Sequence, residues 1–270
     1  MSNDTATPLL EQTPTINPYR TAVGEVLRRL QWDVKPESWG SRARMKSFHN
    51  IHAGEKCVIL CNGPSLLKSD LSLLKDVKTF GLNKINLLFD KTDFRPTYIA
   101  SVNPFVNEQN AAFFNQTDIP LFLRNDAMQH VRPRKNITFM YPASQQKFAR
   151  DCSVSIYEGY TVTFVALQLA YHMGFKEVAL IGCDHNFAQT GPANKAVVSG
   201  EKDPSHFDPN YFAGGVKWQL PDLLQSEVSY SMARDVFEGS GRRIYNCTEG
   251  GKLEIFPRMP LGEFTQSRRS

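Results

Sequence analysis

The fold class follows from residues 57–66, which read Cys57-Val58-Ile59-Leu60-Cys61-Asn62-Gly63-Pro64-Ser65-Leu66. Five apolar residues in succession are typical of a strand buried on both faces, and the Asn-Gly-Pro-Ser that follows is typical of a tight turn. Further short apolar runs follow along the chain, and helical segments separate several of them. These runs are residues 79–82, 98–102, 121–123, 137–140, 178–181 and 243–246. The alternation predicts an α/β fold, namely a single Rossmann-like domain with a mainly parallel twisted sheet and helices on both faces.

The segment before this core predicts an arm and a helical extension. Residues 1–18 are polar and lack periodicity, which is typical of a flexible arm. Apolar positions from Tyr19 to Trp32 follow helical spacing, so we expect residues 19–53 to form an N-terminal helical extension, in which residues 39–52 are a polar connection. We expect the apolar face of the helix to pack on the body or on a second subunit rather than on a membrane.

The α/β domain itself is predicted to span residues 54–258. A helix is expected from about Thr163 to Met173, and Gly174 should close it in the left-handed conformation. A long helix is expected over residues 221–238, before the last strand. Residues 259–270 are expected to be a flexible tail.

Composition and charge limit the function classes. The chain has 270 residues and a net charge of +4, which suits one domain and a phosphorylated ligand but gives little support for nucleic-acid binding. No signal peptide is recognisable, and no apolar run approaches the roughly 20 residues of a membrane helix. We therefore expect a cytoplasmic protein, with a peripheral position at the inner membrane face as the alternative. Five cysteines without a CxxC pair indicate buried free thiols in a reducing compartment rather than a zinc site.

The turn after the first strand is a candidate phosphate site. In an open α/β sheet the ligand lies beyond the carboxyl ends of the strands, and the first strand-to-helix turn is the usual phosphate cradle. Gly63 allows close approach of the backbone, Pro64 follows it, and Ser65 can cap the next helix while offering N–H and hydroxyl groups to an anion. Neither a GxGxxG sequence nor a Walker A lysine is present, so dinucleotide binding and P-loop hydrolysis are poorly supported. The turn alone is equally consistent with a structural role.

Asparagines at three strand ends strengthen the prediction of a ligand. Asn62, Asn83 and Asn103 each follow a predicted strand, at the edge of the sheet where ligands bind. A carboxamide both donates and accepts hydrogen bonds, so it can bind ribose hydroxyls or a base edge. Asn as a turn residue explains any one of them, but it explains three at equivalent places less well.

Acid–base groups follow the sixth predicted strand and a later loop. Asp184 and His185 come directly after the strand, and His206 lies in a segment rich in Gly, Pro and aromatic residues. Imidazole near neutral pH is a common general acid or base. Asp184, Asp208 and His206 could instead hold Mg²⁺, although no HxH, HExxH or DxD pattern supports that reading.

The loop from Gln189 to Trp218 is predicted to be a lid. It has no helical or strand period, but it carries Phe207, Tyr211 and Phe212, which need something to cover. Donor binding would order the loop and bring His206 or Tyr211 against the phosphate or the acceptor. Permanent packing of these aromatic residues on the sheet is the alternative.

The chain resembles the MptE-like family over about residues 54–258. The family is named after archaeal enzymes that transfer diphosphate from ATP to 6-hydroxymethyl-dihydropterin, and many bacterial members resemble surface-polysaccharide or flagellin glycosylation proteins. The motifs that carry the resemblance are Cys61-Asn62-Gly63-Pro64-Ser65-Leu66, Phe80-Gly81-Leu82-Asn83, Gly174-Phe175-Lys176-Glu177-Val178, Gly182-Cys183-Asp184-His185-Asn186, His206-Phe207, Asn210-Tyr211-Phe212, Ile244-Tyr245-Asn246-Cys247-Thr248 and Gly250-Gly251-Lys252.

A more distant resemblance is to bacterial sialyltransferases that use CMP-sialic acid. The matching residues are Asn62, Gly63, Ser65, Asn83, Asn103 and Pro104. In that family these positions surround the CMP moiety. Thr161-Val162-Thr163 stands where the family has Thr-Ser-Gly, and the resemblance implies that Thr161 and Thr163 contact the donor. The family's catalytic histidine falls near Asn210 and His206 matches an earlier, non-catalytic one, so the base is left open between His185 and His206.

These observations favour a sialyltransferase-like glycosyltransferase. It would transfer a sugar, plausibly a nonulosonic acid, from a CMP-activated donor to a hydroxyl acceptor in surface polysaccharide or glycoconjugate synthesis. No cofactor is required in this interpretation, and the expected partners are the nucleotide-activated donor, a carbohydrate acceptor and, as an option, a second copy of the chain. One alternative is a Mg²⁺-dependent 6-hydroxymethylpterin diphosphokinase. The other is a non-catalytic scaffold of a glycosylation complex.

Overall fold

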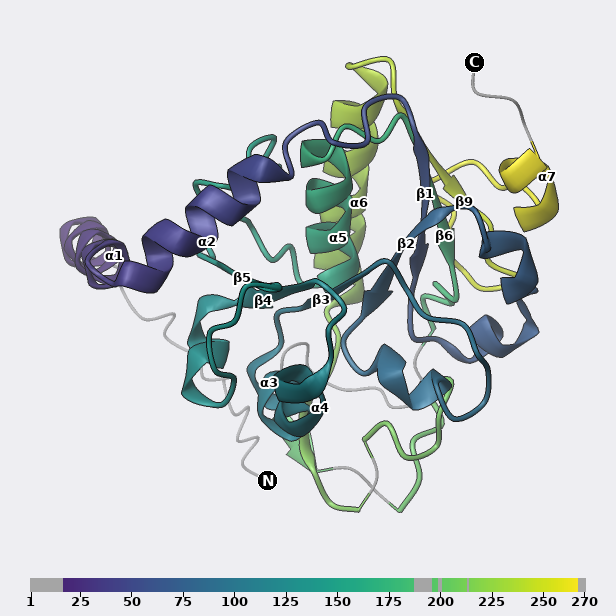
Figure 1. Ribbon diagram of the computed structural model, residues 1–270, viewed down its shortest axis with the longest axis horizontal. Coiled ribbons are helices and arrows are strands. Elements are labelled where there is room, and N and C mark those ends of the chain that lie inside the picture. Colours follow the sequence, from purple (N-terminus) through teal and green to yellow (C-terminus); the bar gives the residue numbers. More distant parts are fainter. Residues whose placement is uncertain (1–16, 187–195, 199–200, 213, 267–270) are drawn as a thin grey trace, which may run out of the picture.

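A seven-stranded parallel sheet forms the centre of the computed structural model, which describes residues 17–186, 196–198, 201–212 and 214–266 (Figure 1). Each neighbouring pair of strands runs parallel, in the order β5-β4-β3-β2-β1-β6-β9. The strands are β1 (Lys56–Leu60), β2 (Lys78–Leu82), β3 (Tyr98–Ser101), β4 (Leu121–Arg124), β5 (Ile137–Met140), β6 (Glu177–Ile181) and β9 (Arg243–Asn246). Every strand expected from the sequence is present, which confirms the Rossmann-like α/β fold.

The strand order places a topological switch point between β1 and β6. Strands β1 to β5 follow one another toward one edge of the sheet, and β6 returns to pair with the other side of β1. The loops that leave the carboxyl ends of β1 and β6 therefore diverge to opposite faces and leave a crevice, which is where doubly wound α/β proteins bind ligands.

Two hydrophobic clusters cover the two faces of the sheet, as the alternation of side chains along the strands requires. Cys57 and Ile59 face the cluster that contains the long helices α5 (Val162–His172) and α6 (Leu223–Glu238). Val58 and Leu60 face the other cluster. Short helices cover that second face: η1 (Pro64–Lys68), η2 (Leu71–Leu74), η3 (Ile85–Leu88), α3 (Pro104–Gln109), α4 (Ala111–Gln116), η4 (Asn125–Gln129) and α7 (Leu261–Gln266). Gly174, with φ of 90°, follows α5 as predicted.

The N-terminal extension consists of two helices, α1 (Pro18–Asp33) and α2 (Pro36–Ser47). The prediction of a polar connection over residues 39–52 was wrong, because α2 covers most of it. The helix was missed because its buried positions include Ser38 and Ser41, which break the apolar pattern. The buried hydroxyl of Ser41 accepts a hydrogen bond from the Phe139 N–H at 2.9 Å, so a polar residue holds the helix against β5.

The face of α1 that packs is not the apolar stripe seen in the sequence. The stripe is exposed, with Tyr19, Val23, Val26, Leu27 and Leu30 all more than half accessible. The helix is instead attached to the body by residues off the stripe. Trp32 is buried, and Arg29 donates to the Val154 carbonyl at 2.7 Å and lies 4.9 Å from the centre of the Tyr141 ring.

The C-terminal segment also differs from the expectation. Residues 261–266 form α7, and Leu261 and Phe264 are buried against the sheet, so this part of the expected flexible tail is folded. The expected arm lies outside the described residues except for Asn17 and Pro18. Among the helices that the structure describes, none combines the length and apolar character that a membrane span needs.

The predicted lid is only partly described, because residues 189–195, 199–200 and 213 lie outside the described residues. Two short strands, β7 (Ala196–Val198) and β8 (Lys217–Gln219), pair antiparallel in this region. Between them, Phe207, Tyr211 and Phe212 are buried in the core, with 2%, 1% and 6% exposure. The segment 201–212 therefore packs as a wall of the body, which matches the alternative considered for these aromatic residues.

Candidate active site

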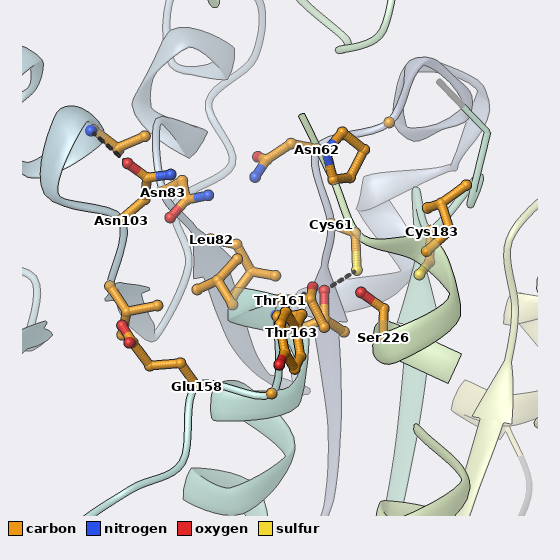
Figure 2. Close-up of a pocket in the computed structure, with 18 of the residues that line it drawn as sticks. Cys61, Asn62, Leu82, Asn83, Asn103, Glu158, Thr161, Thr163, Cys183 and Ser226 are labelled. Atoms are coloured by element: carbon orange, nitrogen blue, oxygen red, sulfur yellow. Dashed lines mark hydrogen bonds between the residues drawn. The ribbon is translucent and has the colours of Figure 1, made fainter. Parts of the chain in front are cut away.

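A pocket of about 500 Å³ opens at the switch point, at the carboxyl ends of β1, β2, β3 and β6 (Figure 2). Most of the residues predicted from the sequence line it, although they come from widely separated segments. These are Asn62, Gly63, Asn83, Asn103, Thr161, Thr163, Asp184, His185, His206 and Tyr211. Pro64, Ser65 and Asp208 are the predicted residues that do not line the pocket, and Asp208 instead forms an ion pair with Lys91.

Asn62 lines the pocket, and its side-chain oxygen is buried. The residue is 8% exposed, and its Oδ1 has no hydrogen-bond partner in the described structure. Its main chain is fixed, since its carbonyl accepts from the Phe207 N–H at 2.9 Å. An unpaired buried acceptor costs about 1–3 kcal/mol, so Asn62 carries an energetic cost beside the pocket. Figure 2 shows this side chain directed toward Asn83 across the pocket.

The other two asparagines are partly engaged. Ser101 Oγ lies 3.2 Å from Asn83 Oδ1 and 2.7 Å from Asn107 Oδ1, so its single proton can serve either oxygen. Asn103 Oδ1 accepts from the Phe105 N–H at 2.9 Å and caps α3. Asn103 thus has the structural role that turn asparagines commonly have, and only its amide NH₂ can serve a ligand.

The turn after β1 already binds a carboxylate of the protein itself, that of Asp184. Asp184 Oδ2 accepts from the Ser65 N–H at 3.1 Å and from the Ser65 hydroxyl at 2.8 Å. A Cβ on Gly63 would lie 1.9 Å from the same oxygen, so only glycine permits this approach. The cap position of η1 is Gly63 rather than Ser65, and the serine groups expected to bind phosphate instead bind Asp184. The sequence argument identified an anion site, but its occupant is this carboxylate.

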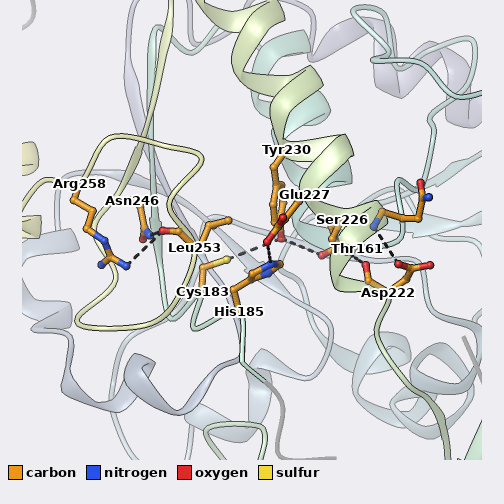
Figure 3. A network of polar contacts seen from close by, with 11 residues as sticks. Thr161, Cys183, His185, Asp222, Ser226, Glu227, Tyr230, Asn246, Leu253 and Arg258 are labelled. Atoms are coloured by element: carbon orange, nitrogen blue, oxygen red, sulfur yellow. Dashed lines mark hydrogen bonds and ion pairs between the residues drawn. The ribbon is translucent and has the colours of Figure 1, made fainter. Parts of the chain in front are cut away.

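The N-terminus of α5 is the second place where a phosphate can bind. Thr161 caps the helix by accepting from the Thr163 N–H at 3.3 Å, and both residues line the pocket. No acidic residue stands in the first turn of α5, so the partial positive charge of the helix end is uncompensated there. The hydroxyls of Thr161 and Tyr230 lie 3.4 Å apart (Figure 3).

Backbone strain is concentrated around the pocket. Among the described residues, four non-glycine residues have positive φ angles, and three of these, Asn83 (50°), Tyr160 (62°) and His185 (51°), line the pocket. Asparagine adopts this conformation readily, whereas for tyrosine and histidine it costs on the order of 1 kcal/mol or more. Strained residues of this kind persist where a particular side-chain placement is required.

His185 is held by a carboxylate from α6 (Figure 3). Its Nε2 lies 2.9 Å from Glu227 Oε1, and the carboxylate side chain is 47% exposed. In the tautomer that donates from Nε2 to Glu227, Nδ1 is the hydrogen-bond acceptor of the ring. The contact with Glu227 fixes the orientation of the ring.

His206 is held in a second, more deeply buried pair. Its Nδ1 lies 2.7 Å from Asp203 Oδ2, and its ring stacks on Tyr211 with 4.0 Å between centroids. Burial acts to raise the pKa of Asp203, but the hydrogen bonds from His206 and Ser205 outweigh it and hold the pKa below its usual value. The stacked ring is thereby fixed in orientation.

Lys84 attaches the segment 201–212, which carries Tyr211 and Phe212, to the body of the protein. Its Nζ donates to the Tyr211 carbonyl and to Gln109 Oε1, both at 2.6 Å, and lies 4.9 Å from the centre of the Phe212 ring. Burial lowers the pKa of Lys84 to about 8. The wall is thus attached to the body by a buried ammonium group and does not depend on a ligand for its position.

Arg124 and Glu158 line a further part of the pocket, and Asp126 contacts the arginine from outside the lining. Arg124, at the end of β4, donates from Nη1 to both oxygens of Glu158 at 3.2 Å, and its Nε lies 3.1 Å from Asp126 Oδ2. Burial raises the pKa of both Glu158 and Asp126, against the effect of the arginine. Sequence reasoning missed this group.

The charges of the pocket are few. Among the described lining residues, Arg124 is the permanent cation, and Asp184 and Glu158 are the carboxylates. Both carboxylates are engaged, by Ser65 and by Arg124, and the described residues contain no cluster of His, Cys, Asp or Glu suited to a metal ion. Magnesium prefers free carboxylate oxygens, so these side chains as arranged do not fit a magnesium site.

For one of the residues that the sequence analysis missed, a local sequence pattern existed; for the others, none did. Asp203 stands three positions before His206, so a local pair could have been suggested. Glu227 lies on a separate helix, and Arg124 and Glu158 are 34 residues apart, so only the folded chain brings these groups to their partners.

Comparison with known proteins gives one family. The family model described as 6-hydroxymethylpterin diphosphokinase MptE-like matches residues 39–190, which is more than half of the chain. No curated protein sequence matches. Among solved structures, the MAf glycosyltransferase from Magnetospirillum magneticum AMB-1 is similar, with 15% sequence identity and a TM-score of 0.49. The alignment covers 92% of this chain and 42% of that protein, so this chain spans less than half of its length.

Proposed function

The chain belongs to the MptE-like family, and we propose that it is a transferase that binds a nucleotide-activated donor in the pocket at the switch point. The group transferred is a sugar, and the donor we propose is a CMP-linked nonulosonic acid. The observation that carries the proposal is the unpaired Asn62 oxygen, buried in a pocket of ligand size among carboxamides and hydroxyls. A nucleoside supplies the hydroxyl and amino donors that such an oxygen lacks.

The charge of the pocket disfavours a nucleoside triphosphate. One permanent cation faces two carboxylates among the described lining residues, so a triphosphate would meet few compensating charges. A CMP-linked sugar carries one phosphodiester, which the positive end of the α5 dipole and the Thr161 and Thr163 hydroxyls can bind. The carboxylate of a nonulosonic acid would lie within reach of the Arg124 side of the pocket.

The transfer requires one proton to move. The acceptor oxygen bonds to the anomeric carbon, the bond from that carbon to the phosphate oxygen breaks, and the nucleotide leaves as the monophosphate. The acceptor proton passes to neutral His185, whose other ring nitrogen is bound by Glu227. Asp203 and the stacked ring of Tyr211 hold His206 in a fixed orientation. Its ring then forms part of the pocket lining beside the donor. No metal or other cofactor takes part in this proposal.

A pterin diphosphokinase is the second candidate, because the matching family model carries that description. Such an enzyme needs Mg²⁺ to bridge the phosphates that it transfers. Asp184 would be the first ligand to consider, but its Oδ2 already accepts two hydrogen bonds from Ser65. A diphosphokinase would therefore have to break this contact, which makes it the weaker proposal.

A calorimetric and thermal-shift panel tests the choice. The ligands are CMP, CDP, UDP, ATP with Mg²⁺, and 6-hydroxymethyl-dihydropterin. We expect CMP to bind and to stabilise the protein by about 2.7 kcal/mol at a hundred times its dissociation constant. Binding of ATP with Mg²⁺ and the pterin, without CMP, would move the assignment to the diphosphokinase. Binding of none of these ligands would indicate a scaffold that has kept the fold without the activity.

A further inference from the structure

A second pocket, of about 370 Å³, lies between α1 and the carboxyl ends of β4 and β5. The helix contributes Glu25, Arg28, Gln31 and the buried Trp32, and the body contributes Asn125 and Tyr141. Figure 1 shows α1 beyond the β5 edge of the sheet. The polar side of α1 lines this pocket, while its apolar stripe faces outward.

The second pocket adjoins the donor pocket. Arg124, Ala143, Ser144 and Glu158 line both, so these residues form a common boundary. Glu158 is fixed there by the two-pronged contact with Arg124, and its side chain is 34% exposed. A molecule in the second pocket would therefore meet a molecule in the first pocket at this carboxylate.

The lining of the second pocket is polar, and four of its five charged side chains form ion pairs. Glu25 pairs with Arg28, as Glu158 does with Arg124, and Lys35 is a third cation in the lining. The remaining polar groups include the carboxamides of Gln31 and Asn125 and the hydroxyl of Tyr141. Burial raises the pKa of Tyr141, so its hydroxyl remains a neutral donor. Carboxylates, carboxamides and guanidinium groups together offer the donors and acceptors that a neutral polyol requires.

We propose that this second pocket binds the acceptor, a neutral carbohydrate, with the hydroxyl to be modified at the boundary formed by Arg124 and Glu158. The proposal rests on the proposed function, since it supplies the acceptor for the same transfer. Glu158 accepts a hydrogen bond from a neighbouring hydroxyl of the acceptor and so orients the sugar, which leaves the proton of the attacking hydroxyl for His185. The N-terminal helix α1 is thereby part of the acceptor site, so the extension has a binding role in addition to packing.

Saturation-transfer NMR with simple glycosides tests the assignment. The probes are methyl β-D-galactopyranoside, methyl α-D-glucopyranoside and methyl N-acetyl-β-D-glucosaminide, each titrated to 20 mM in the absence of nucleotide. We expect at least one of these neutral glycosides to bind. Absence of saturation transfer to all three neutral glycosides would overturn the proposal.

Two exposed residues of α1 locate the binding. Gln31→Ala and Arg28→Ala should each weaken the glycoside about tenfold, the loss expected for a hydrogen bond to a charged or strongly polar group. The matched controls are Gln116→Ala on α4 and Arg20→Ala at the start of α1, which line neither pocket and should leave binding unchanged. Equal binding by wild type and Gln31→Ala would place the sugar elsewhere and contradict the inference.

A parallel titration with CMP separates the two proposals. If CMP binds and the glycoside is insensitive to the α1 variants, the acceptor assignment fails and the donor assignment stands. If CMP does not bind but the glycoside responds to Gln31→Ala and Arg28→Ala as predicted, the donor assignment fails and the second pocket remains a carbohydrate site.

Discussion

Replacement of Asn62 by alanine should stabilise the free protein and weaken nucleotide binding at the same time. The buried Oδ1 has no hydrogen-bond partner in the described structure, and such a group costs about 1–3 kcal/mol. Alanine removes the oxygen, and because the side chain lines an open pocket, its loss leaves no closed cavity in the core. A gain of about 1 kcal/mol in the free energy of unfolding is expected, which corresponds to a rise in Tm of about 2–4 °C for a chain of this size.

Nucleotide affinity should change in the opposite direction. Loss of the hydrogen bond that the ligand makes to Asn62 costs about 0.5–1.5 kcal/mol, so the Kd for CMP should rise up to about tenfold. Urea denaturation gives the free energy of unfolding, and calorimetry gives the Kd. A variant that unfolds more easily than wild type while it binds CMP normally would show that Asn62 is structural, and the pocket assignment would lose its main support.

Asn103→Ala is the matched control at the same pocket. Its Oδ1 caps α3 through the Phe105 N–H, so alanine should lower the free energy of unfolding by about 1 kcal/mol. Two asparagines at equivalent strand ends are thus expected to change stability with opposite sign. If both variants shifted stability in the same direction, the distinction between an unpaired and a capping carboxamide would be refuted.

Further predictions concern proton transfer, metal, packing and pH. His185→Gln should lower kcat about 10²–10⁴-fold while CMP still binds, and Glu227→Gln should lower it less; a full kcat in His185→Gln would remove the proposed base. Transfer should persist in EDTA, measured with a CMP-sugar donor, and a loss that magnesium restores would favour the diphosphokinase. Gly63→Ala should destabilise the protein by about 1–3 kcal/mol in urea, because the new Cβ meets Asp184 Oδ2; wild-type stability would contradict the role of that contact. The pKa of Lys84 is lowered from 10.5 to about 8, so the unfolded chain binds more protons in this interval and stability should rise from about pH 8 to about pH 10.5. Denaturation at pH 7.5 and 10 should show this rise to be smaller in Lys84→Met, and an unchanged pH slope would refute it.

The fold was predictable because the central strands are buried on both faces and leave continuous apolar runs. The helix α2 could not be found in the same way, since it buries Ser38 and Ser41, and the hydrogen bond from the Phe139 N–H to Ser41 exists only in the folded chain. The outward apolar stripe of α1 shows the same limit. Periodicity identifies the helix, but it does not decide which side faces the body.

The site was predictable where chain topology alone brings residues together. Parallel strands end at one edge, so Asn62 and Asn83 had to lie near each other. Which of the polar side chains would bind one another was not predictable. Ser65 and Asp184 both looked like ligand-binding groups, but they bind each other, and His185 finds Glu227 across 42 residues. Such pairings depend on helix placement within an ångström or so, which no local pattern encodes.

The positive φ angles of Tyr160 and His185 affect how this protein can be engineered. Glycine adopts such angles without strain, so a mutant library selected only for heat resistance should enrich glycine at these two positions. Each enriched clone would lose a side chain from the ligand cavity. Selection for heat resistance alone would therefore lower the affinity for the ligand. Experiments that stabilise this protein should measure ligand binding in every round, or should keep Tyr160 and His185 unchanged in the library.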